Sequence, residues 1–466
     1  MARIGVDEWV AESDQRTEGY RGRASPLVAA WDRVPPAARI LLLAVGLAVF
    51  PLTTGSDFVL RVGINTLLLA ILALGLNVVV GWAGLLDLGY IAFYGFGAYT
   101  YALLSSEQLG IHLPTPLAVL IVLVACALLG LLLGLPSRRL LGDYLAIVTL
   151  FFGQIFVELV VNLDAVTGGP SGIAGVDPFV LLGFEFLTPR DYYYLTAGAA
   201  VIVTLVLYLI GESRTGRAWR AVREDPLAAE MMTMPVNLLK LKAFALGSAI
   251  AGLAGSIFAA VQIGVFPRNF ETPFLILIYA AVILGGAGSL AGAILGAVVV
   301  SVSLELLRDA DQATVLFYGL LLAGLLARVR PWRKLAAVLG GTIALGLALH
   351  AIAAAVWPEA VAGTPQATGA LGDALDAWLV LPEGATTAGN IGFVVLVAAI
   401  ILFTQVRERT RTLLLVPVIY LAAFVWEARL VQEPSVTRQL LLGALLVVVM
   451  ISRPRGLLGS ERKEIV

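Results

Sequence analysis

Long apolar runs limit what this chain can fold into more than any other feature of its sequence. A run of about 17–25 apolar residues is long enough to cross the hydrocarbon core of a bilayer as a helix. Runs that are too short are expected to be tilted, broken by glycine or re-entrant. Fourteen segments are candidates: 39–53, 62–80, 85–104, 116–135, 143–162, 191–211, 241–265, 273–287, 290–308, 313–328, 335–357, 391–406, 412–427 and 438–452.

Composition excludes the other broad classes of protein. Of the 466 residues, 59% are hydrophobic and only 14% are charged, whereas about 25% of the residues of an ordinary soluble chain are charged. A disordered chain is poor in apolar residues, so that class is excluded as well. The net charge of −1 gives no reason to expect nucleic acid as a partner. The sequence therefore predicts an all-α, polytopic transmembrane helical bundle surrounded by membrane lipid.

The distribution of basic residues predicts the orientation of the chain. Loops of one parity, together with both termini, hold 25 of the 31 lysines and arginines. Because basic residues gather on the cytoplasmic side, both termini are expected inside. Residues 1–38 carry arginines but no apolar stretch of the kind that a signal peptide needs. They are therefore expected to form a cytoplasmic tail.

Many of the 48 glycines lie inside the apolar runs. Small residues at four-residue spacing allow helix backbones to approach closely in lipid. This spacing occurs at Gly130 with Gly134, along Gly247, Ala251 and Gly255, and at Gly292 with Gly296. The segment 285–292 is expected to break one apolar region into two half-helices. The pattern predicts a tightly packed bundle.

Polar residues inside the apolar runs are few and scattered. Such residues are either functional or satisfied structural hydrogen-bonders, and the sequence leaves both readings open. They are Asn65, Asn77, Asp87, Gln154, Glu158, Gln262 and Glu305. They form no evident relay of the kind that an ion-driven pump needs.

The motifs of an enzyme are missing from the sequence. His112 and His350 have no metal-ligand spacing, and the single cysteine, Cys126, lies in an apolar run where packing is its expected role. None of the four lysines follows a glycine, so the sequence contains no GxxxxGK[ST] phosphate loop. We expect no catalytic residue, no metal and no cofactor, and any ATPase that drives this chain must be a separate polypeptide.

The charged segment 212–242 is the most informative loop. Asp225 is a suitable N-cap and Pro226 suits the first turn of a helix, while Pro235 limits that helix at its other end. The predicted short helix would expose small or flexible side chains: Ala228, Ala229, Met231 and Met232. These side chains could dock a partner, although an ordinary charged loop would have a similar composition.

At this point the sequence becomes recognisable. The stretch GLNVVVGWAGLLDLGYIAFYGFGAYTYALL, residues 75–104, resembles the signature of LivM-type permeases, which are membrane subunits of ABC importers for branched-chain amino acids. Further stretches are similar to the same family in the same order: 142–150, 162–176, 216–232, 240–259, 283–297 and 440–459. The fold that the resemblance implies is a permease bundle of the ABC importer type in a bacterial cytoplasmic membrane.

The resemblance also implies partners and roles for residues. The family works with a second, LivH-like permease subunit, two ATP-binding subunits and a periplasmic or extracellular substrate-binding protein. Residues 224–234 correspond to the coupling helix that docks on the ATPase, with Glu224, Asp225, Ala228, Ala229 and Glu230 at its contact positions. Candidates for the substrate pathway are Asn77, Asp87, Tyr90, Thr149, Gln154, Thr167, Gly168 and Gly169.

Two features depart from the family pattern. Thr233 stands where the family usually has glycine. In addition, residues 309–435 intervene before the final helix and tail, 436–466, and separate them from a permease core expected at 39–308 that includes the coupling loop 212–240. This insertion contains four apolar segments, an even number that preserves the orientation of the last helix, and a loop at 358–390. We expect its helices to pack at the periphery.

Three alternatives remain open from sequence alone. The first is a permease for urea or another small amide within the same superfamily. The second is a self-sufficient secondary transporter, and the third is a membrane enzyme. The stretches GDYLAIVTL and TGGPSGI, at 142–150 and 167–173, favour the amino-acid branch.

Overall fold

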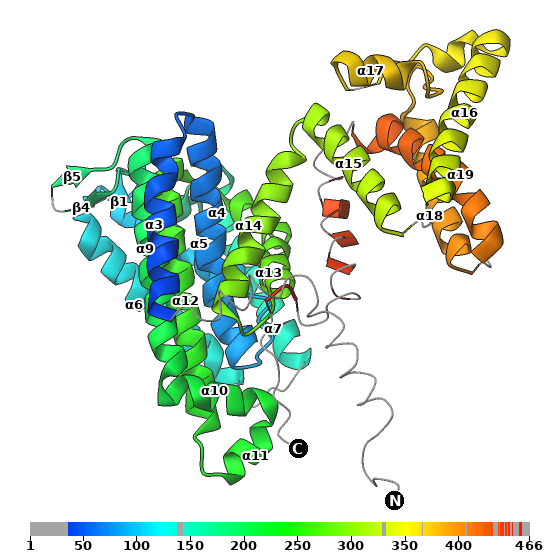
Figure 1. The fold of residues 1–466 in the computed structure, drawn as a ribbon. Helices are drawn as coiled ribbons and strands as arrows, with labels where there is room; N and C mark the ends of the chain where they lie inside the picture. Colours follow the sequence, from blue (N-terminus) through cyan, green and yellow to red (C-terminus); the bar gives the residue numbers. More distant parts are fainter. Residues whose placement is uncertain are drawn as a thin grey trace, which may run out of the picture. The chain divides into compact units, whose positions relative to one another are not determined.

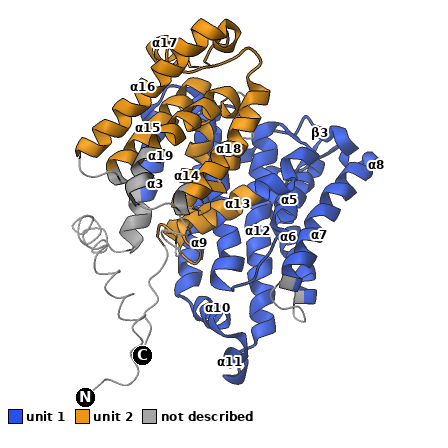
Figure 2. Ribbon diagram, turned by 90° about the vertical axis from the view of Figure 1, so that its right-hand side faces the viewer, with its two compact units in different colours: residues 1–275 blue, residues 276–466 orange. Residues whose placement is uncertain are grey.

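The computed structural model describes residues 36–458, apart from 138–142, 182, 329–331, 366, 406–407, 432–436, 438, 442, 445, 448–449 and 451–455. The expected tail at 1–38 and the final segment 436–466 lie largely outside the described residues. The chain divides into two compact units, residues 1–275 and 276–466, which Figure 2 distinguishes by colour. Each unit is considered by itself below.

Unit 1 is a helical bundle, as the apolar runs predict. Its long helices are α3 (Pro36–Thr53), α4 (Asp57–Leu76), α5 (Tyr90–Leu104), α6 (Thr115–Ser137), α7 (Asp143–Asn162), α9 (Pro189–Glu212) and α12 (Val236–Gln262). Its shorter elements are η1 (Asn77–Trp82), α8 (Asp164–Thr167), η2 (Gly169–Ser171), α10 (Arg214–Glu224), α11 (Pro226–Met231) and η3 (Pro267–Phe270). Helix α13 (Thr272–Gly285) begins at the end of this unit.

Helix α12 packs closely against α5 and α6, and glycine makes this possible. A β-carbon on Gly97 of α5 would lie 2.7 Å from the carbonyl oxygen of Gly252, and one on Gly255 would overlap the backbone of α5 at Tyr94. On the α6 side, a β-carbon on Gly130 would lie 2.8 Å from the carbonyl oxygen of Phe244. The packing role predicted for the small residues of α12 is confirmed, and Gly252 joins the predicted stripe.

Three short antiparallel strand pairs connect the loops at one end of unit 1. They pair β1 (Ser105–Ser106) with β2 (Ile111–His112), β3 (Ile173–Ala174) with β6 (Gly264–Val265), and β4 (Val180–Leu181) with β5 (Phe184–Glu185). The Nδ1 atom of His112 lies 2.6 Å from the Asp177 carboxylate, which raises the pKa of His112 by hydrogen bonding and by its charge. Figure 1 shows β1, β4 and β5 at the end of the bundle opposite α11.

Unit 2 contains the break predicted at 285–292. Helix α13 ends at Gly285 and α14 (Leu290–Leu306) begins after a turn in which Gly286 and Gly288 have φ values of 110° and 98°. Only glycine adopts such values without strain. The Ser289 side chain caps α14 by accepting a hydrogen bond of 3.1 Å from the Gly292 amide. The break expected between these helices is therefore confirmed.

The apolar segments expected in the insertion form helices α15 (Ala310–Arg328), α16 (Trp332–Val356), α18 (Thr386–Gln405) and α19 (Glu408–Val425). The loop expected at 358–390 contains η4 (Pro358–Val361) and α17 (Gly369–Asp376). Helix α19 continues into η5 (Trp426–Leu430), where the Trp426 ring stacks on Phe317 of α15 with 4.4 Å between ring centroids. Its indole N–H donates to the Thr314 hydroxyl over 3.1 Å.

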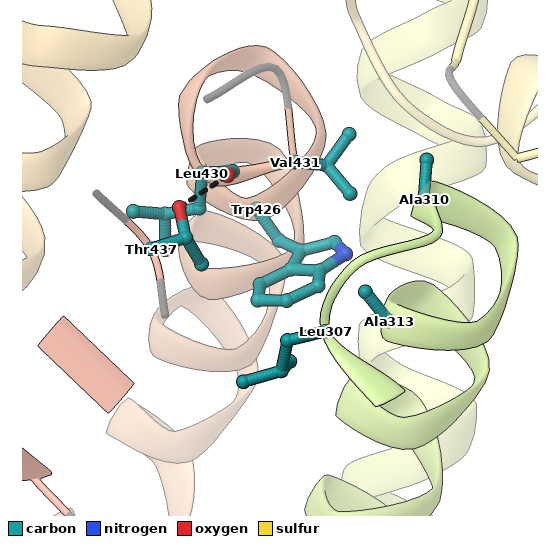
Figure 3. Close-up of a pocket in the computed structure, with 7 residues that line it drawn as sticks. All are labelled: Leu307, Ala310, Ala313, Trp426, Leu430, Val431 and Thr437. Atoms are coloured by element: carbon teal, nitrogen blue, oxygen red, sulfur yellow. Dashed lines mark hydrogen bonds between the residues drawn. The ribbon is translucent and has the colours of Figure 1, made fainter. Parts of the chain in front are cut away.

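Figure 3 shows the small pocket beside Trp426, lined also by Leu307, Ala313 and Val431. Its volume of about 10 Å³ leaves room for roughly one water molecule. The pocket is therefore a packing gap and no ligand site. After the segment expected to be an insertion, the chain contacts the end of α13: the Leu457 and Leu458 amides donate to the Leu284 and Gly285 carbonyls over 2.8 and 2.9 Å.

Fewer of the described helices are long enough to cross a membrane than there are candidate segments, as expected for the short apolar runs. Among the described residues, seven helices are long and apolar enough to span a membrane, or eight if the pair α14 and α15, bent by 118°, counts as one broken span. Fourteen separate crossings are therefore not found there. Helix α5 illustrates the difference: its 15 residues reach only about 22 Å, less than the hydrocarbon thickness.

Candidate functional site

The predicted coupling loop, residues 212–240, contains two short helices, α10 and α11, at one end of unit 1 (Figure 1). This loop is called the coupling segment below. The Ser213 hydroxyl caps α10 by accepting from the Gly216 amide. Asp225 ends α10 and caps α11, because its Oδ1 atom accepts from the amides of Leu227 and Ala228 over 2.9 and 3.0 Å. The short helix capped by Asp225 is therefore confirmed.

One face of α11 is apolar and open to solvent. The exposed fractions of Leu227, Met231 and Met232 are 65%, 77% and 73%, and Ala228 between them is exposed as well. Ala229 was expected on the same surface, but only 5% of it is exposed. That expectation is wrong because residue 229 lies on the opposite side of the six-residue helix, facing the protein.

Helix α11 ends in a Schellman motif built around Thr233. The Thr233 amide donates to the Glu230 carbonyl over 2.9 Å and the Met234 amide donates to the Ala229 carbonyl over 3.1 Å, which is the bond pattern of this motif. Thr233 has a φ of 62°, in the left-handed region that favours glycine. Thr233, which stands where the family usually has glycine, therefore adopts a backbone conformation that favours glycine.

We expect Thr233→Gly to stabilise the end of α11. Glycine removes the strain of the left-handed backbone but adds backbone freedom to the unfolded chain. We expect the first effect to exceed the second by roughly 0.5–1 kcal/mol in the free energy of unfolding. Amide hydrogen exchange at residues 231–236 should therefore slow in Thr233→Gly. Thr233→Asn, which tolerates the same backbone better than threonine, should give a smaller slowing. Faster exchange in the glycine variant would contradict this account of the helix end.

Helix α10 connects α11 to the rest of the bundle. Trp219 is buried, its indole N–H donates to the Leu239 carbonyl over 2.8 Å, and its ring stacks on Trp82 of η1 with 6.1 Å between ring centroids. The Arg223 guanidinium donates to the Gly81 carbonyl. These contacts tie α10 to η1, a π-helical turn of a kind often found at functional sites.

Several predicted pathway residues lie near the turn that follows η1. Asn77 begins η1 and is buried, as are Asp87, Tyr90 and Thr149. The Thr149 hydroxyl accepts from the Leu88 amide over 2.9 Å, and Asp87 accepts from the Gly89 amide over 3.0 Å. The Tyr90 hydroxyl donates to the Gly247 carbonyl of α12 over 3.3 Å. The Asp87 and Thr149 side chains therefore order the end of the turn from residue 83 to residue 89, while Tyr90 ties the start of α5 to α12.

The other predicted pathway residues lie elsewhere. Gln154 is exposed, and its amide donates to the Thr272 hydroxyl over 2.6 Å. Thr167 donates to the Val160 and Leu163 carbonyls over 2.6 and 2.8 Å, while Gly168 and Gly169 both adopt positive φ values in the next turn. The structure thus places the predicted residues in separate groups rather than in one site.

Sequence reasoning missed the residues that anchor the coupling segment. Trp219 and Arg223 read as part of an ordinary charged stretch, although α10 has an apolar side formed by Trp219 and Val222 at a spacing of three residues. That spacing is the signal by which the packed face of α10 could have been found.

The comparisons agree with this architecture. The model of a family described as the branched-chain amino acid transport system, permease component, matches residues 58–329. The chain belongs to this family. The match includes the capped α11 and extends through α15, ending before α16 begins. This permease component therefore has no catalytic role of its own, and its described helices make it a multi-pass membrane protein.

Individual relatives show how far the similarity extends. The high-affinity branched-chain amino acid transport system permease protein LivM of Salmonella typhimurium is 41% identical over 302 residues, which cover 58% of this chain and 70% of the relative. LivM of Escherichia coli is 40% identical over 302 residues, which again cover 58% of this chain and 70% of the relative. A probable LivH permease of Methanocaldococcus jannaschii is 26% identical over 265 residues, covering 54% of this chain and 82% of the relative. No solved structure matches the chain.

Proposed function

We propose that this chain is the LivM-type permease subunit of an ABC importer that moves leucine, isoleucine and valine into the cytoplasm. The observation that carries the proposal is α11, a capped helix with an apolar exposed face at one end of the bundle of a family permease. The partners that this function requires are a LivH-like second permease, two ATP-binding subunits and an external substrate-binding protein. The α11 end and both termini are proposed to be cytoplasmic.

The surface of α11 has the composition of a docking site. Leu227, Ala228, Met231 and Met232 form an apolar centre, and acidic side chains at Glu224, Asp225 and Glu230 surround it. An apolar centre with a polar rim is typical of a protein–protein interface. Ala229 supports this surface from beneath, since it packs against the protein. The partner that fits is the ATPase, because this chain has no phosphate loop of its own.

We propose a route by which docking reaches the pathway. Helix α10 carries movement of α11 to η1 through the Trp219–Trp82 stack and the Arg223 hydrogen bond. Asp87 and Thr149 hold the turn after η1, Asn77 lies in η1 itself and Tyr90 begins the next helix, so a shift of η1 would rearrange this group. Gln154, Thr167, Gly168 and Gly169 are proposed to lie along the outer part of the pathway.

Substrate competition tests the proposed cargo. The chain is co-expressed with its second permease, ATPases and binding protein, and uptake of labelled leucine is measured against unlabelled valine, urea and glutamine. Valine should compete strongly, because it shares the branched apolar side chain and the zwitterion, while urea and glutamine should not. Strong competition by urea would replace this proposal with the small-amide alternative.

A further inference from the structure

A second feature of unit 1 lies at the end of α12 opposite α11. Helix α12 begins five residues after α11 and its 27 residues span about 40 Å, so its last turn is a membrane thickness away from the coupling segment. Figure 2 shows β3 and α8 at this far end and α11 at the other. The turn η3 follows β6 there, and a cleft of about 450 Å³ opens beside it.

The cleft combines two opposite charges with an apolar wall. Val157 and Val161 of α7 and Phe266 line one part, and Arg268, Asn269 and Glu271 line another. A volume of this size lies in the range of small-molecule sites. Pro170, from the predicted pathway loop TGGPSG, and Pro267 complete the lining.

The fold holds both charges at this cleft. Phe270 lies between them in sequence and is buried, with its ring 5.2 Å from that of Tyr94, so it anchors the turn. Arg268 lies within the 3₁₀ turn η3 and Glu271 follows its last residue in an extended conformation, and both side chains line the cleft. Among the residues that the structure describes, neither charged group is engaged in an ion pair or a side-chain hydrogen bond.

We propose that this cleft is an outer acceptor site for a free zwitterionic amino acid with a branched apolar side chain. Arg268 receives the α-carboxylate, because a guanidinium binds a carboxylate with two parallel hydrogen bonds. Glu271 receives the α-ammonium group, and Val157, Val161 and Phe266 contact the aliphatic side chain. The inference rests on the proposed function, which places this end of unit 1 on the side from which substrate arrives.

The test measures binding to the full chain alone in lipid nanodiscs, with no ATPase present. Three probes separate the recognised groups: L-leucine, 4-methylpentanoate, which lacks the ammonium group, and 3-methylbutylamine, which lacks the carboxylate. Arg268→Gln and Glu271→Gln should each weaken leucine binding about tenfold or more, as expected for the loss of a hydrogen bond to a charged group. Arg61→Gln and Glu185→Gln remove exposed charges elsewhere in the unit and serve as controls.

The two variants should fail in opposite ways. Arg268→Gln should lose 4-methylpentanoate and keep 3-methylbutylamine, whereas Glu271→Gln should show the reverse. A misfolded variant would lose both probes, so this pattern separates recognition from folding. Unchanged leucine binding in both variants would overturn the proposal. It would also be overturned if the variants bound the substrate-binding protein more weakly but kept their affinity for leucine.

This experiment is independent of ATP coupling. If leucine binds with the expected pattern but no ATP-driven uptake is found in the complete complex, the acceptor site stands and the proposed function fails. If uptake is normal but the chain alone shows no saturable leucine binding, the proposed function stands and the acceptor site is overturned.

Discussion

Replacing Ala228 with glutamate is expected to reduce ATP-driven leucine uptake to about a tenth of the normal rate or less. Ala228 lies in the centre of the exposed face of α11 and is surrounded by Leu227, Met231 and Met232. An unpaired charge buried in an interface costs about 2–5 kcal/mol, enough to weaken docking more than tenfold. Uptake and ATPase activity of the reconstituted complex measure the effect, and co-purification of the ATPase measures docking.

Two further variants locate the cause. Ala228→Ser keeps the side chain small and should transport normally. Ala229→Glu places the same charge at a position that is only 5% exposed, so it should lower the melting temperature of the chain itself, whereas Ala228→Glu should not. Normal transport by Ala228→Glu would remove the docking role assigned to α11.

A large effect on folding is expected at Gly97. A β-carbon there would lie 2.7 Å from the carbonyl oxygen of Gly252, and the backbone of α12 cannot yield as a flexible side chain can. Overpacking usually costs about 1–3 kcal/mol, and Gly97→Val should reach at least the upper end of that range. Thermal unfolding and the yield of monodisperse protein in detergent measure the loss.

A glycine elsewhere in the same unit provides the control. Gly198 of α9 is exposed, and a β-carbon there would meet nothing within 4 Å. Gly198→Val should therefore leave the melting temperature nearly unchanged. Equal melting temperatures for Gly97→Val and the unaltered chain would contradict the close contact of α5 with α12.

Features set by short-range rules could be predicted from the sequence. Asp225 caps α11 because a side-chain oxygen next to the first turn finds free amides wherever that helix lies in the fold. The break after Gly285 follows from glycines at Gly286 and Gly288, whose backbone other residues adopt only with strain. The stripe on α12 is visible because small-residue spacing directly sets how closely helices pack.

Features set by three-dimensional packing could not be predicted. The burial of Ala229 depends on how α11 lies against the rest of unit 1, and the sequence gives only its helical phase. Helix α5 looks like a crossing by hydropathy, yet it is short and enclosed by protein, and hydropathy does not distinguish a lipid contact from a protein contact. The resemblance to the family places the predicted pathway residues in one group. Their separation into the turn near Asp87 and the loop near Thr167 depends on the fold.

The central proposal is that this chain provides a transport pathway across the membrane. ATPase subunits that it does not contain drive this pathway by docking on α11. Accumulation of labelled leucine in proteoliposomes tests it most directly, with the complete complex and with this chain alone. The account predicts accumulation against a gradient only when the complete complex is supplied with ATP and the binding protein. Concentrative uptake by the chain alone, driven by an ion gradient, would contradict it.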